Sequence, residues 1–184
     1  MGTTTSRRPS GPRRRPRAPA PDVPGPDGLP EWEFARPDRH EDRQMMRRWE
    51  RDSPIEMRTA DPDGPPPGDI PRRRVWMRVK GTLPDEEAVH AAMLAYSSDR
   101  GLIATARLPH GMGRNNWSGA SLDHAIWFHR PPRFDDWILF TSESPVAHAA
   151  RALIFGQMYR ADGTRIASVV QEGLIRTARE APPK

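Results

Sequence analysis

The chain contains no cysteine, and this absence excludes several kinds of site. Disulfides, thiolate metal sites and a cysteine nucleophile are all ruled out. Long apolar runs are missing too, because none is long enough for the hydrophobic region of a signal peptide or for a membrane helix. We therefore expect a cytoplasmic protein without a membrane span.

Apolar residues are scarce and unevenly placed. Only 35% of the 184 residues are hydrophobic, against 29% charged, and the chain has 22 prolines. Nearly all apolar clustering falls between Val75 and Ile175. A chain of this length suits one domain with a core of its own. We expect that domain over residues 72–177, with a linker-like segment at 21–71 and a short tail at 178–184.

The net charge of +5 comes from the first residues of the chain. A run of arginines precedes the first acidic residue, Asp22: Arg7, Arg8, Arg13, Arg14, Arg15 and Arg17. This composition predicts a disordered basic tail over 1–20. A targeting or nucleic-acid role stays open, although the prolines oppose an amphipathic transit helix and no aromatic residue is available for base stacking. We expect no nucleic-acid partner.

The linker-like segment contains two short predicted elements. A helix is predicted over 39–51, with Asp38 as its N-cap and Glu41 in its first turn. A short strand near 54–58 follows, because apolar and polar residues alternate there. The loop at 61–71 is too rich in proline for regular structure.

The apolar region begins with a strand and a helix. Residues 75–81 alternate as a half-buried strand, and helix-start signals introduce a helix over about 85–98. The apolar stripe of that helix advances by three and four residues: Val89, Ala92, Met93 and Tyr96. Asp99 comes next on the same face, so we expect a carboxylate at the inner end of a buried helix. It is either a functional acid or a helix-ending residue bonded to nearby backbone amides.

Strand-like runs occupy the rest of the domain. They cover about 120–129, 136–143, 149–161 and 165–176. The last two are joined by an Asp-Gly turn at 161–164, which is a strong hairpin signal, and prolines place a turn at 131–135. One helix against consecutive antiparallel strands predicts an α+β fold.

The run over 120–129 carries an unusual number of polar groups for an apolar strand. If it alternates regularly, Ser121, Asp123 and His129 share one face. His124 then falls on the other face with Leu122, Ile126 and Phe128, which predicts a hydrogen-bonded core histidine. The two histidines lie on opposite faces and are not expected to share a metal. We expect neither a metal nor a cofactor.

Several blocks of the sequence together resemble the C-terminal half of the acyl-CoA thioesterase II family. In order, the blocks are 75–80, 83–85, 95–99, 109–111, 121–131, 137–139, 144–145, 150–151 and 167–176. The resemblance implies a hotdog fold, in which an antiparallel sheet wraps around a central helix. It also implies that acyl-CoA is the substrate and that it is hydrolysed to a free fatty acid and coenzyme A.

The same resemblance implies three catalytic residues, namely Asp99, Ser121 and Gln171. Asp99 would be the general base, while Ser121 and Gln171 would orient the attacking water. A backbone amide, not assigned from the sequence, would bind the oxyanion. Ser121 stands where threonine is common, so the hydroxyl is kept but a methyl group is lost. Taken alone, Gln171 in its apolar row is a buried hydrogen-bonding residue, either structural or catalytic.

Family members carry two hotdog domains in one chain, with acyl-CoA sites between them, whereas this sequence resembles only the second domain. We therefore expect a homodimer or pairing with a separate hotdog half, because a lone hotdog exposes apolar sheet surface. The alternative is a non-catalytic or partner-dependent hotdog subunit, either an acyl-CoA-binding module or a truncated half of a double-hotdog enzyme.

Overall fold

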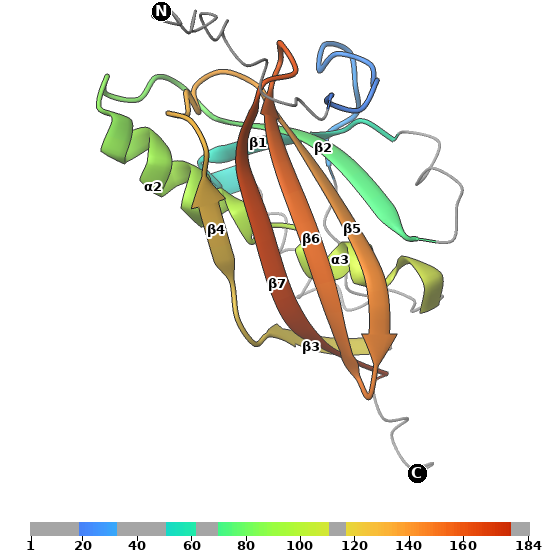
Figure 1. Ribbon diagram of the computed structural model, residues 1–184. Coiled ribbons are helices and arrows are strands. Elements are labelled where there is room, and N and C mark those ends of the chain that lie inside the picture. The colour runs from blue at the N-terminus through green and yellow to red at the C-terminus, as the bar shows by residue number, and fades with distance from the viewer. Residues whose placement is uncertain (1–18, 33–50, 62–69, 111–116, 178–184) are drawn as a thin grey trace, which may run out of the picture.

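The computed structural model describes residues 19–32, 51–61, 70–110 and 117–177. These residues form a seven-stranded antiparallel sheet that curls along one side of the helices (Figure 1). The strands are β1 (Ile55–Thr59), β2 (Arg72–Val79), β3 (Trp117–Ser121), β4 (Ala125–Phe128), β5 (Ile138–His148), β6 (Arg151–Arg160) and β7 (Arg165–Thr177). Their order is β1-β2-β5-β6-β7-β3, and β4 also pairs with β7.

The helices lie on the inner side of this curl. They are α2 (Glu87–Ser98), the short α3 (Leu102–Ala106) and a 3₁₀ turn, η1 (Leu108–His110). α3 packs against β5, β6 and β7, and Figure 1 shows α2 alongside β4 and β7. A curled antiparallel sheet around one long helix is the hotdog arrangement, so the predicted α+β class is confirmed.

Two apolar clusters hold the sheet in place. The larger one fills the space between the sheet and the helices, and its fully buried members include Met77, Leu94, Phe134 and Ile154. Burial of each such side chain stabilises the fold by about 1.5–3 kcal/mol.

The smaller cluster lies on the outer face of the sheet. It consists of Ala60, Trp76, Leu139 and Tyr159, and residues from 19–32 cover it. The indole Nε1 of Trp76 donates to the backbone oxygen of Pro24 (2.9 Å), which fixes this cover. The interval that we expected to be linker-like thus supplies both β1 and part of the cover over the outer cluster.

Predictions for three segments fall almost entirely outside the described residues. They are the tail at 1–20, except for its last two residues, the helix over 39–51, except for Arg51, and the tail at 178–184. Within the described ranges, no helix combines the length and the apolar character needed to cross a membrane.

The buried face of α2 differs from the predicted apolar stripe. Tyr96, a member of that stripe, is 54% exposed, whereas His90, Leu94 and Ser97 face the core. Each of the two polar members makes at least one hydrogen bond, although His90 Nε2 is buried without a partner among the described residues. His90 Nδ1 accepts from the backbone N–H of Phe134 (3.0 Å), and Ser97 Oγ donates to a main-chain oxygen one turn earlier (2.8 Å). Met93 of the predicted stripe packs against the core, but the stripe as a whole is not the buried face, because it was predicted from apolarity alone.

The β6–β7 hairpin is confirmed, with Gly163 at a positive φ of 79° in its turn. The turn between β5 and β6 was missed, because it is built from two alanines. Ala149 and Ala150 both have positive φ, 50° and 61°, where Asn-Gly is the usual sequence. β6 therefore starts at Arg151 and not at residue 149.

Gly156 in β6 leaves no room for a side chain. A Cβ atom there would lie 2.6 Å from the ring of Phe140 and 3.2 Å from Cβ of Val169. We expect Gly156→Ala to lower the free energy of unfolding by about 1–3 kcal/mol through overpacking. Thermal or urea unfolding measures the change. Gly25→Ala is the matched control, because nothing lies within 4 Å of its Cβ position, and an equal effect in both variants would contradict the steric explanation.

Candidate active site

Polar side chains from three elements meet on the inner side of the sheet. Asp99 directly follows the last residue of α2, Ser121 ends β3, and Gln171 lies within β7. β3 is paired with β7 so that Ser121 faces Gly173, two residues from Gln171 and on the same face. The fold thus places residues that are far apart in the sequence at one point.

Hydrogen bonds connect these three side chains. Gln171 Nε2 donates to Ser121 Oγ (2.7 Å), and Ser121 Oγ donates to Asp99 Oδ1 (3.3 Å). Gln171 is completely buried, whereas the side chain of Asp99 is 56% exposed. The structure therefore brings together the three residues that the sequence singled out, in a chain that runs from the core to the surface. It does not place Asp99 at the inner end of a buried face, as the helix pattern predicted.

His124 belongs to the same hydrogen-bonded series, and the sequence interpretation missed this. Its Nδ1 lies 2.7 Å from Gln171 Oε1, and its Nε2 lies 2.7 Å from Ser98 Oγ. Nδ1 is also 4.0 Å from Asp99 Oδ1. His124 is hydrogen-bonded, as predicted, but its position in the core on the face opposite Ser121 is wrong, because the side chain is 24% exposed and lies against the same amide as Ser121.

The error comes from a break in the strand between Ser121 and Ala125. Ser121 pairs with Gly173 and Ala125 pairs with Val170, so three residues stand opposite two. One extra residue reverses the alternation of side chains, as in a β-bulge. Regular alternation across 120–129 was therefore the incorrect assumption.

Asp123 stabilises this break. Its Oδ1 accepts from the backbone N–H of Glu172 (2.7 Å), and the N–H of Leu122 donates to the backbone oxygen of Glu172 (2.9 Å). An Asp side chain thus replaces a backbone partner where the ladder is interrupted. His129 contacts Ser168 Oγ instead (2.6 Å), so the two histidines do have different surroundings, as expected.

The arrangement is suited to removing a proton from a water molecule as that water attacks an electrophilic carbon. A carboxylate can only accept hydrogen bonds, a hydroxyl can donate and accept, and a primary amide can do both from different atoms. A water held by these three groups would face a base and two orienting groups. Among the described residues, no cluster of three or more His, Asp or Glu side chains could hold a metal ion.

The curled antiparallel sheet around α2 defines a hotdog domain. Residues 46–174 match the family model for acyl-CoA thioesterase, and the chain belongs to that family. The resemblance seen in the sequence is thereby confirmed.

Curated relatives have the same family name. Human acyl-coenzyme A thioesterase 8 is 38% identical over 107 residues, which cover 58% of this chain and 34% of the relative. Acyl-CoA thioesterase 2 of Haemophilus influenzae is 39% identical over 127 residues, which cover 67% of this chain and 44% of the relative. The chain thus matches less than half the length of either relative.

Solved structures agree with this assignment. The crystal structure of acyl-CoA thioesterase II TesB2 from Mycobacterium marinum is 33% identical, with a TM-score of 0.73 over 94% of this chain and 61% of that one. A hot dog protein of unknown function from Alicyclobacillus acidocaldarius is 17% identical with a TM-score of 0.61, covering 96% of this chain and 60% of the other. The second likeness supports the fold alone.

Proposed function

We propose that this chain hydrolyses acyl-CoA to a free fatty acid and coenzyme A through a water activated by Asp99. The observation that carries the proposal is the hydrogen-bonded chain Gln171–Ser121–Asp99, which brings a buried amide, a hydroxyl and a half-exposed carboxylate together. Membership of the acyl-CoA thioesterase family supports the choice of a thioester as substrate.

In the proposed reaction, a water is held between the Asp99 carboxylate and Ser121. The Ser121–Asp99 distance of 3.3 Å is long for an O–H···O bond, so an inserted water would replace a weak contact. As the water oxygen attacks the thioester carbon, its proton passes to Asp99. The C–S bond then breaks, and the proton held by Asp99 returns to the departing thiolate.

We expect Asp99→Asn to lower kcat by about 10²- to 10⁴-fold, because the amide keeps the size of the side chain but cannot accept the proton. KM should change little, because no binding group is lost. Release of free thiol from a panel of acyl-CoAs measures both constants.

Asp136→Asn is the matched control, because Asp136 is an exposed aspartate that precedes β5 and belongs to none of the segments that carry the proposed site. Its activity should equal that of the unmodified protein. Hydrolysis that survives Asp99→Asn unchanged would remove Asp99 from the mechanism.

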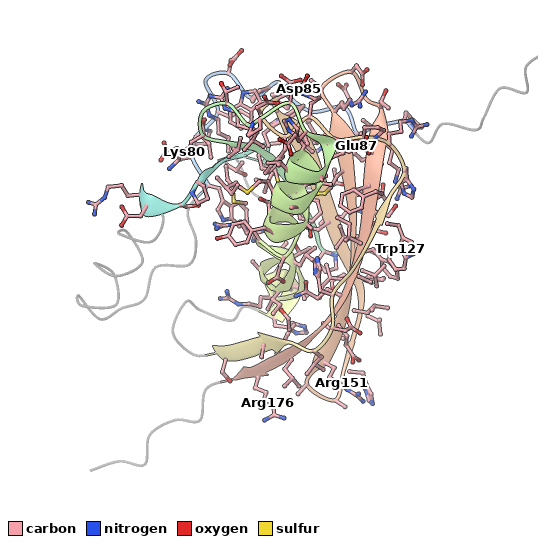
Figure 2. All side chains as sticks on the ribbon, turned by 90° about the vertical axis from the view of Figure 1, so that its left-hand side faces the viewer. Lys80, Asp85, Glu87, Trp127, Arg151 and Arg176 are labelled. Atoms are coloured by element: carbon pink, nitrogen blue, oxygen red, sulfur yellow. The ribbon has the colours of Figure 1, made fainter. Side chains whose placement is uncertain are left out.

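We also propose that the chain works as a pair of hotdog domains, either as a homodimer or with a separate hotdog half. We define the β4 edge surface as Leu122, Trp127 and Phe128, large apolar side chains that are all exposed. Figure 2 shows Trp127 at the margin of the domain. β4 pairs only with β7 among the described strands, so its other edge is available. Exposed apolar side chains on an open edge are typical of a protein interface.

We expect Trp127→Lys to convert a dimer to a monomer, because it places a charge in the proposed interface. Light scattering or sedimentation gives the mass. Val146→Lys is the matched control, since Val146 is a comparably exposed apolar residue on β5. A fully active wild-type monomer would contradict the pairing.

A partner-dependent subunit is the second candidate, and it rests on the limited coverage of the relatives. The chain matches 34–44% of the length of the two relatives described above. An inactive wild-type chain that gains activity when mixed with a separate hotdog half would favour this alternative. A cytoplasmic location stays a prediction from the sequence.

A further inference from the structure

We propose that His124 is a positioning residue that fixes the orientation of the Gln171 amide. This inference rests on the proposed function, because it assigns a role within the same site. The break between β3 and β4 turns His124 toward Gln171. Its Nδ1 lies 2.7 Å from Gln171 Oε1.

The direction of each hydrogen bond in the series from His124 to Asp99 follows from the carboxylate of Asp99. A carboxylate only accepts, so Ser121 must donate to it, and Ser121 must therefore accept from Gln171 Nε2. The amide oxygen of Gln171 is left as an acceptor. His124 Nδ1 lies against this oxygen and has to carry a hydrogen.

Ser98 completes the network on the other side of the ring. Its hydroxyl lies 2.7 Å from His124 Nε2 and 2.8 Å from the backbone oxygen of Ala95. With a neutral ring, Ser98 donates to Nε2. With a protonated ring, Ser98 accepts from Nε2–H and donates to Ala95 instead. In both states Nδ1 keeps its hydrogen, so the bond to Gln171 is retained whatever the charge of the ring.

The orientation of this amide matters because Gln171 is completely buried. If the amide turned over, its oxygen would face Ser121 and draw the hydroxyl hydrogen away from Asp99 or from a water inserted between Ser121 and Asp99. The water would then lose one orienting group. A donor at position 124 prevents this, because the turned amide would present an NH₂ group to Nδ1–H. A misplaced reacting group can cost about 10²-fold in rate.

Two substitutions at His124 separate a positioning donor from a proton-transfer group. Asparagine can place its side-chain NH₂ where Nδ1 lies, but it has no titratable ring, whereas alanine has neither. We expect His124→Ala to lower kcat by about 10- to 100-fold with little change in KM. We expect His124→Asn to restore most of the kcat that His124→Ala loses, because a donor to the Gln171 oxygen is present again.

His148→Asn is the matched control, because His148 is an exposed histidine at the end of β5. It should not change activity. If His124→Asn were as inactive as His124→Ala, the imidazole itself would be required, and the positioning role would be wrong.

A double-mutant cycle with Gln171 tests whether His124 acts through the amide. In a Gln171→Ala background, His124→Ala should cause no further loss of kcat, because the group that it orients is absent. Independent losses that multiply would indicate a general structural effect and overturn the inference. Thermal unfolding of each variant shows whether the protein is folded.

A nuclear magnetic resonance experiment tests the orientation without using activity. In ¹⁵N-labelled protein, the side-chain NH₂ of Gln171 should exchange slowly in wild type and in His124→Asn, and rapidly in His124→Ala. Unchanged exchange in His124→Ala would overturn the inference even if the enzyme were active. The expected exchange pattern in a wild type that hydrolyses no acyl-CoA, either alone or mixed with a separate hotdog half, would support the positioning role and refute the proposed function alone.

Discussion

The site depends on the hydrogen bonds of one buried amide. Gln171 has no exposed surface, so both ends of its amide must find partners in the protein. Ser121 satisfies the nitrogen and His124 satisfies the oxygen. Both partners come from the same short segment, so the backbone there has to present two side chains in the same direction from positions three apart. A regular strand cannot do this.

The surrounding fold supplies that backbone. β7 is long enough to pair with β4 near its start and with β3 near its end, and the extra residue between these two strands reverses the alternation (Figure 1). Gly173, opposite Ser121, would carry a Cβ only 3.1 Å from Ile103 of α3. Alanine at this position would require the Ile103 side chain to shift by a few tenths of an ångström. The absence of a side chain on β7 therefore lets the helices approach the point where the polar groups meet.

Part of the fold and part of the site could be predicted from the sequence, each from a different kind of signal. Alternation and turn residues located β2 and β7 and the hairpin before β7, because these signals are local. The three site residues Asp99, Ser121 and Gln171 were predicted from the family resemblance. The inner face of α2 could not be predicted from apolarity, since His90 and Ser97 are buried through hydrogen bonds to distant or backbone groups. The place of His124 depends on an extra residue whose only visible sign is the register against another strand.

β4 links the site to the proposed interface. Ile126 packs against the inner core, while the neighbouring Trp127 is exposed on the edge of the same strand. The strand begins one residue after His124, and it pairs with β7 over only a few residues. A second domain paired along β4 would order this edge, and the ordering would extend to the segment that carries His124. If activity requires a partner, contact along β4 would explain the requirement, because β4 directly follows the segment that carries His124.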